Sequence, residues 1–258
     1  MNGALSGKRA LVCGASQGIG AAIAAALADM GCAVTALART QEKLEAVVTA
    51  LPGDGHRVVA LDIGDWNALN TAISLELAEG DIQILINNSG GPAPGPISQA
   101  PAEAFSAGLQ NHIIAANGLT QLLLPGMKRA GYGRIINIIS TSVKIPIPNL
   151  GVSNTIRGAM ASWAKTLSLE VAADGITVNN ILPGFTQTPR LDKLIAATAT
   201  RLGKSEDEVA QMWRERVPAR RFGDPKETAA AAAFLASPAA GYINGVNLPV
   251  DGGRTGCL

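Results

Sequence analysis

Residues 8–20 read KRALVCGASQGIG, and this segment is the strongest indication of the fold. A short apolar run typical of a buried strand leads into a turn with glycines at 14, 18 and 20, followed by an Ala-rich helical segment. Glycine is needed where the backbone turns tightly, approaches a pyrophosphate and packs a helix against a strand. The start of the next helix offers unpaired N–H groups to phosphate oxygens. The stretch therefore predicts a nucleotide-binding strand, turn and helix.

The same alternation of apolar runs and longer helical segments continues along the chain. Strands are expected at 8–14, 33–38, 57–61, 82–87, 134–140, 176–182 and 246–250. Helices are expected at 18–30, 41–50, 66–78, 102–110, 112–130, 151–172 and 226–236. The strands are apolar throughout, as in sheets covered on both faces. This predicts an α/β protein with a doubly wound Rossmann-type fold, a seven-stranded parallel sheet and helices on both faces.

No linker interrupts the pattern, so residues 1–258 are expected to form one domain. The segment 190–221 is polar, charged and helical in pattern, and it follows the sixth strand. An insertion there lies over the crevice where such sheets bind ligands, so it is expected to be a substrate-covering lid, a solvated surface excursion or an oligomer contact.

Composition excludes several classes of protein. Hydrophobic residues make up 47% of the 258 residues and the net charge is only +1, so the chain is neither disordered nor basic enough for a nucleic-acid or membrane-surface binder. Three scattered cysteines predict neither disulfides nor a metal site. The N-terminus has no signal-peptide pattern, which indicates the cytoplasm. Only two tyrosines occur in the whole chain.

Several further motifs resemble the short-chain dehydrogenase/reductase family, in particular its 3-oxoacyl-ACP reductase-like members. The glycine spacing of the turn is one of them, and Cys13 stands where the family usually has Thr. The others are NNSG at 87–90, PGFTQT at 183–188, RFGDP at 221–225 and VDGG at 250–253. The resemblance covers roughly residues 5–253 and implies a Rossmann-type fold, a nicotinamide cofactor, a small-molecule carbonyl or alcohol substrate, and a homotetramer or homodimer with 247–253 as part of an interface.

The end of the second strand indicates which nicotinamide cofactor binds. NAD enzymes usually place an acidic residue here, but this chain has Arg39, which can pair with a 2′-phosphate, followed by Thr40. NADP(H) is therefore favoured over NAD(H). The residues expected at the cofactor, from the turn and from the resemblance, are Gly14, Ser16, Gln17, Gly18, Ile19, Gly20, Arg39, Thr40, Asp62, Ile63, Asn88, Ser89, Gly90, Arg157, Pro183, Gly184, Thr186 and Thr188.

This chain departs from the family's pattern of catalytic residues. The resemblance places the carbonyl-binding serine at Ser140, but the positions of the family's tyrosine and lysine hold Ser153 and Arg157. Neither tyrosine, Tyr132 or Tyr242, heads this helix. A serine hydroxyl is a poor acid, and an arginine is effectively always charged. Arg157 could keep the ribose-binding half of the lysine's role, while the proton must come from elsewhere.

Three sources of the proton stay open. Lys144 follows Ser140 by four residues, although it could be a solvent-exposed loop lysine. His112 has a suitable unperturbed pKa and stands where the family has a catalytic asparagine, with Asn111 adjacent, although it could serve only packing or a subunit interface. A water chain held by Ser140 and Ser153 is the third route.

The sequence supports an NADP(H)-dependent oxidoreductase acting on a ketone/alcohol pair with a non-standard proton donor. The alternative is a non-catalytic NADP(H)-binding regulatory or sensor protein, and a lyase or isomerase is a weaker third interpretation. Nothing in segment 190–221 selects a substrate.

Overall fold

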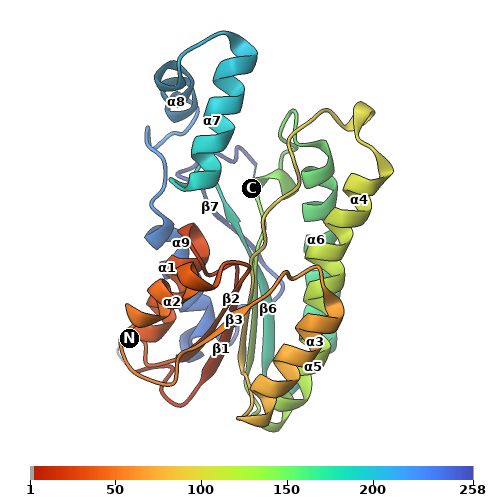
Figure 1. Ribbon diagram of the computed structural model, residues 1–258, viewed down its shortest axis with the longest axis vertical. Coiled ribbons are helices and arrows are strands. Elements are labelled where there is room, and N and C mark those ends of the chain that lie inside the picture. Colours follow the sequence, from red (N-terminus) through yellow and green to blue (C-terminus); the bar gives the residue numbers. More distant parts are fainter. Residues whose placement is uncertain (1–2, 258) are drawn as a thin grey trace.

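A seven-stranded parallel sheet forms the centre of the computed structural model, which describes residues 3–257 (Figure 1). The strands follow the order β3-β2-β1-β4-β5-β6-β7. Their bounds are β1 Arg9–Cys13, β2 Ala33–Ala38, β3 Arg57–Ala60, β4 Ile84–Asn87, β5 Gly133–Ile138, β6 Ile176–Pro183 and β7 Asn247–Val250. The strand order reverses between β1 and β4, which is the point where doubly wound sheets bind ligands. The expected fold class is confirmed.

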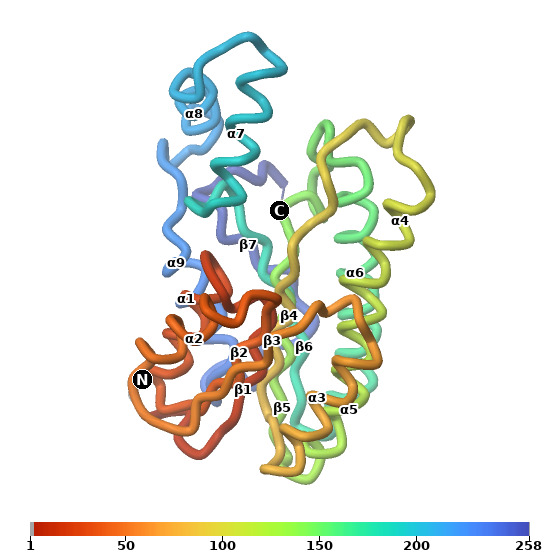
Figure 2. The backbone as a smooth tube through the Cα atoms, in the orientation of Figure 1, coloured from red at the N-terminus to blue at the C-terminus, as the bar shows by residue number. Residues whose placement is uncertain are grey.

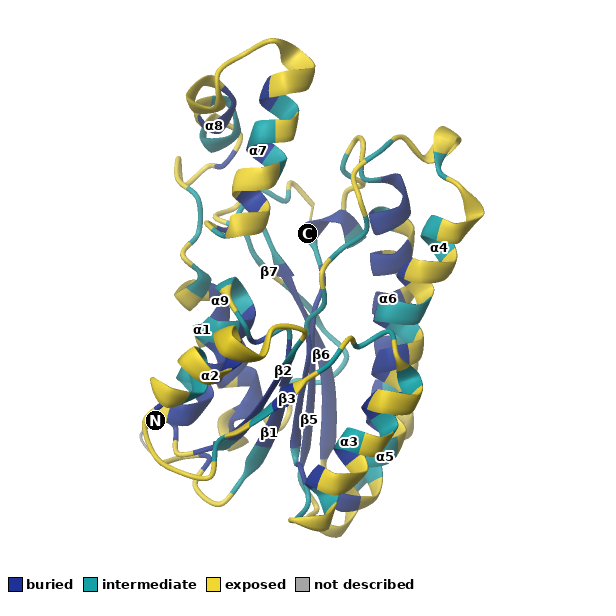
Figure 3. Ribbon diagram, in the orientation of Figure 1, coloured by how far each residue is buried: buried dark blue, intermediate teal, exposed yellow. Residues whose placement is uncertain are grey.

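Helices cover both faces of the sheet, as the uninterrupted apolar strands require (Figure 3). The helices are α1 Gly18–Asp29, α2 Gln41–Thr49, α3 Trp66–Ala78, α4 Ala102–Leu109, α5 Ala115–Arg129, α6 Gly151–Glu170, α7 Pro189–Leu202, α8 Glu206–Glu215 and α9 Pro225–Ala236. One apolar core joins α1, α2 and α9 to the sheet, and the other joins α3, α5 and α6 to its opposite face. The helices therefore leave the loops at the carboxyl ends of the strands accessible to a ligand.

The helices expected at 102–110 and 112–130 are not separated by a loop. A π-helical turn, Gln110–Ile114, joins α4 to α5 without a break. Such turns are often found at functional sites, because the extra residue changes the direction in which side chains point. Here the turn contains His112, whose side chain is buried near the carboxyl ends of β4 and β5.

A row of asparagine side chains crosses four neighbouring strands. The register pairs Asn87 of β4 with Asn137 of β5, Asn137 with Asn180 of β6, and Asn180 with Asn247 of β7. Each side-chain Nδ2 donates a 2.8 Å hydrogen bond to the Oδ1 of the next asparagine in this order. The row fixes the relative heights of the strand ends on which the site is built.

The segment expected to form a lid consists mainly of α7 and α8, which project beyond the carboxyl ends of the strands (Figure 2). The two helices share a small apolar core that includes Leu191, Ile195 and Val209. Phe185 stacks on Trp213 with 4.8 Å between ring centroids, which ties this core to the loop after β6. The segment is therefore a packed unit, and its role as a lid stays a prediction. Among residues 3–257, no helix is long and apolar enough to cross a membrane.

Candidate active site

The glycine turn between β1 and α1 has the geometry that the sequence predicts. Gly14 and Gly18 have φ of +63° and +58°, a left-handed region that other residues rarely adopt. A Cβ on Gly20 would clash with the Gly14 carbonyl oxygen. The Asn88 amide donates to the Cys13 and Gly14 carbonyls at 3.2 and 3.3 Å, which joins the end of β4 to the turn. Within residues 3–257 no side chain caps the start of α1, which leaves its first N–H groups available to an anion.

Two residues expected at the cofactor are Thr188, which lies beside this turn, and Arg39, which follows β2. Thr188 lies against Gly18, since a Cβ on Gly18 would be 3.2 Å from the Thr188 Cγ2. Arg39, directly after β2, has an exposed guanidinium that is 4.0 Å from the Asp62 carboxylate. A contact this long at the surface contributes little, so Arg39 is available to a phosphate.

Arg157 spans the ends of two strands. It lies on α6 and is only 8% exposed. Its Nη1 donates to the Ile138 carbonyl of β5 at 2.9 Å, and its Nη2 donates to the Ser89 carbonyl after β4 at 3.5 Å. Burial, and then the charge of Arg190, lowers the pKa of Arg157 to about 10, so the guanidinium is still charged at neutral pH. The structure thus fixes a positive charge at the carboxyl ends of β4 and β5, where such sheets bind ligands.

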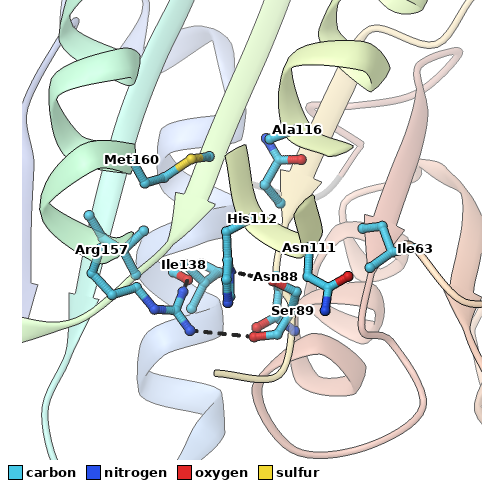
Figure 4. Close-up of a pocket in the computed structure, with 11 residues that line it drawn as sticks. Ile63, Asn88, Ser89, Asn111, His112, Ala116, Ile138, Arg157 and Met160 are labelled. Atoms are coloured by element: carbon cyan, nitrogen blue, oxygen red, sulfur yellow. Dashed lines mark hydrogen bonds between the residues drawn. The ribbon is translucent and has the colours of Figure 1, made fainter. Parts of the chain in front are cut away.

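His112 faces the same place from the π-helical turn (Figure 4). Its Nδ1 lies 2.6 Å from the Ser89 hydroxyl, while its buried Nε2 has no hydrogen-bond partner within residues 3–257. Burial, together with the charges of Arg157 and Arg190, lowers the pKa of His112 to about 3. The imidazole is therefore neutral at pH 7, and His112 lacks the near-neutral pKa that made it a candidate proton donor.

A small cavity lies where these groups meet (Figure 4). Its wall is formed by Ile63, Asn87, Asn88, Ser89, Asn111, His112, Ala116, Ile138, Ile139, Arg157 and Met160. Four residues expected at the cofactor thus come together: Ile63, Asn88, Ser89 and Arg157. The Oδ1 of Asn87 is a second buried polar atom without a partner in the described part of the chain.

The other expected catalytic residues lie outside the wall of this cavity. Ser140 follows β5 by two residues, and its Oγ accepts a 3.1 Å hydrogen bond from the Ser142 N–H. Ser153 is buried on the same face of α6 as Arg157. Lys144 is half-buried at the end of the 3₁₀ turn Thr141–Val143.

Both tyrosines lie elsewhere, as the sequence indicates. Tyr132 precedes β5 at the amino end of the strand, where its hydroxyl donates to the Ala236 carbonyl. Tyr242 is fully exposed. No tyrosine within residues 3–257 therefore stands beside Ser140 or Arg157.

Sequence reasoning missed Arg190 and Asn87. Arg190 was only the first residue of the polar segment, yet its Nη1 donates to the Gly91 carbonyl at 3.2 Å. Asn87 was only the first residue of the NNSG motif, yet its side chain lines the cavity. The only local signal for Arg190 was its place just after the PGFTQT motif.

The doubly wound sheet and the glycine turn before α1 are typical of α/β dehydrogenases. A family model described as Enoyl-(Acyl carrier protein) reductase matches residues 14–255. The chain belongs to the short-chain dehydrogenase/reductase family, and it is an oxidoreductase of this family.

Similar proteins agree over nearly the whole chain. The 3-oxoacyl-[acyl-carrier-protein] reductase FabG of Vibrio cholerae is 35% identical over 252 residues, which cover 96% of this chain and 98% of that protein. The NADPH-dependent reductase BacG of Bacillus subtilis is 32% identical over 254 residues, with 96% and 98% coverage. The crystal structure of L-sorbose reductase from Gluconobacter frateurii, complexed with NADPH and L-sorbose, has a TM-score of 0.93 at 32% identity, with 100% of both chains covered.

Proposed function

We propose that this chain catalyses the NADP(H)-dependent interconversion of a ketone and an alcohol with a proton donor other than tyrosine. The observation that carries the proposal is the buried, charged Arg157, which lines a small cavity at the carboxyl ends of β4 and β5. A fixed positive charge in a poorly solvated site stabilises negative charge that develops on a reacting oxygen.

The residues present fit NADP(H). The uncapped start of α1 suits a pyrophosphate, and the exposed Arg39, followed by Thr40, suits a 2′-phosphate. Asp62 and Ile63 would border the adenine, residues 88–90 the nearer ribose, and Pro183, Gly184, Thr186 and Thr188 the nicotinamide side. The relatives point the same way, because BacG is named an NADPH-dependent reductase and the L-sorbose reductase structure contains NADPH. When bound, the reduced nicotinamide supplies a hydride.

The chain's own residues would position the substrate carbonyl and stabilise the negative charge that develops on its oxygen. Ser140 would donate a hydrogen bond to the carbonyl oxygen, and Ser153 would hold a water beside it. Arg157 would stabilise the developing alkoxide while it holds the ribose. With His112 neutral, two proton sources remain, Lys144 and a water held by Ser140 and Ser153. Loss of turnover in Lys144→Met would favour the lysine.

The test is turnover measured by nicotinamide absorbance across a broad panel of ketones and alcohols. Ser140→Ala is expected to lower kcat by about 100-fold with unchanged NADPH affinity. Ser142→Ala is the matched control, because the buried Ser142 hydroxyl has no hydrogen-bond partner among residues 3–257. Confirmed NADPH binding with no turnover on any compound would overturn the proposal in favour of a non-catalytic NADP(H)-binding regulatory or sensor protein. The neutral His112 and the distant tyrosines are the observations that favour that second function.

A further inference from the structure

Two arginines from different parts of the chain converge on Gly91. Arg157 reaches it from α6 and Arg190 from the first turn of α7. A Cβ placed on Gly91 would be 2.7 Å from the Arg190 Nη2 and 3.3 Å from the Arg157 Nη2. Since glycine leaves this space open, both guanidinium groups approach the same short piece of backbone.

No carboxylate within residues 3–257 forms an ion pair with either arginine. Within residues 3–257, the two guanidinium groups donate to neutral backbone carbonyls, those of Ile138, Ser89 and Gly91. The charge of Arg190 lowers the pKa of Arg157, which shows that the two like charges repel each other. Neighbouring positive charges of which one is buried are costly without a counterion, so the pair is suited to an anion from outside the chain.

The location of the pair relates it to the substrate. Arg157 contacts the carboxyl ends of β4 and β5, and Ser140 follows Ile138 of β5 by two residues. Arg190 is exposed, so an anion can reach it from solvent, and it begins the segment that projects over this edge of the sheet. An anionic group between the two guanidiniums would therefore lie beside the proposed carbonyl position.

We propose that Arg190, with the charge of Arg157 beside it, binds a carboxylate of the substrate, so that the substrate is an oxo acid and the product a hydroxy acid. The assignment rests on the proposed oxidoreductase function and adds the class of substrate. Guanidinium groups match carboxylates in a planar, two-pronged arrangement. The pyrophosphate of the cofactor would bind instead at the turn beside Gly18, where the start of α1 has no side-chain cap within residues 3–257. The two arginines are therefore not required to bind the pyrophosphate.

The test measures binding of malonate to the NADPH-saturated protein by calorimetry, with dimethyl malonate as the neutral analogue. Malonate is expected to bind and the diester is not. Arg190→Gln is expected to weaken malonate binding roughly 10- to 100-fold, the range for one lost hydrogen bond to a charged group. Lys193→Gln is the matched control, because it removes the same charge from an exposed site on α7 and is expected to change affinity less than about 2-fold.

The affinity of each variant for NADPH distinguishes a substrate carboxylate from a cofactor phosphate as the anion that the arginines bind. Unchanged NADPH affinity in Arg190→Gln, together with weaker malonate binding, supports a substrate carboxylate. Weaker NADPH binding with malonate unaffected would assign the pair to a cofactor phosphate and overturn the proposal. Equal binding of diester and malonate would also overturn it. Malonate binding requires no turnover, so an inactive protein that binds malonate through Arg190 would refute the proposed function and leave the subsite standing.

Discussion

Asn87 and Asn137 are joined through their side chains, with the Asn87 Nδ2 donating a 2.8 Å hydrogen bond to the Asn137 Oδ1. They are directly opposite in the register of β4 and β5. Because Asn87 also lines the cavity, this bond connects the asparagine row that crosses the sheet to the wall of the candidate site. The row therefore supports both the stability of the sheet and the position of the groups that follow β4.

Asn137→Ala is expected to lower the free energy of unfolding by about 2–4 kcal/mol. The substitution leaves Asn87 Nδ2 and Asn180 Oδ1 without their partners in a buried place. Urea denaturation measures the change. Asn67→Ala, at an exposed position on α3, is the control and is expected to stay within about 0.5 kcal/mol of the unmodified protein. Similar losses in both variants would show that the row contributes nothing particular.

Arg39→Ala is expected to weaken NADPH binding roughly 10- to 100-fold while leaving NADH binding within about 2-fold. The reason is that only NADPH carries the 2′-phosphate that this exposed guanidinium would pair with. Titration of reduced-nicotinamide fluorescence measures both affinities. Lys43→Ala removes a nearby exposed charge from α2 and serves as control. Equal weakening of both cofactors by Arg39→Ala would contradict a role in phosphate recognition.

His112 is expected to make the protein less stable as the pH falls. Its pKa is lowered from 6.5 to about 3 in the folded protein, so below pH 6.5 the unfolded chain binds a proton that the folded one does not. Stability is thus lost between pH 6.5 and about 3, at up to about 1.4 kcal/mol per pH unit. His112→Asn cannot be protonated, so its stability is expected to depend less on pH. Denaturation at about pH 7 and about pH 4.5 measures the free energy of unfolding of both proteins. An equal loss of stability in both on going to the lower pH would refute the prediction.

Glu227 is expected to stabilise the loop before α9 at neutral pH. Hydrogen bonds from Arg221, at 2.6 Å to each carboxylate oxygen, and from the Asp224 N–H lower its pKa from 4.5 to about 2. For an acid shifted this way, the stabilisation is complete above pH 4.5 and is lost as the pH falls to about 2. Glu227→Gln is therefore expected to lower the melting temperature at pH 7 and to match the unmodified protein at low pH.

Glu103→Gln is the control for that comparison, because it changes a carboxylate in the first turn of α4 that has no ion pair within residues 3–257. A melting-temperature difference between Glu227→Gln and the unmodified protein that persists at low pH would mean that the amide disturbs packing instead of removing a charge.

Most of the fold could be predicted because its signals are local. The apolar run at 8–14 became β1, Arg9–Cys13, and the helix at 151–172 became α6, Gly151–Glu170. The join between α4 and α5 could not be predicted, because a π-helical turn differs from an ordinary one by a single residue, and no spacing in the sequence marks it. The place of His112 therefore had to come from the structure.

The glycine turn, the order of strands and helices, and the absence of a tyrosine from the helix after Ser140 all follow from the amino-acid sequence. Each depends on residue type and short-range spacing. Three further features required the folded structure: Arg157 donates to the Ile138 carbonyl, Arg190 donates to the Gly91 carbonyl 99 positions away, and the pKa of His112 is lowered so that it is neutral at pH 7. The physical reason is that the partners of a buried charge, and the pKa that results, depend on burial and strand register. Both arise only when distant segments pack together.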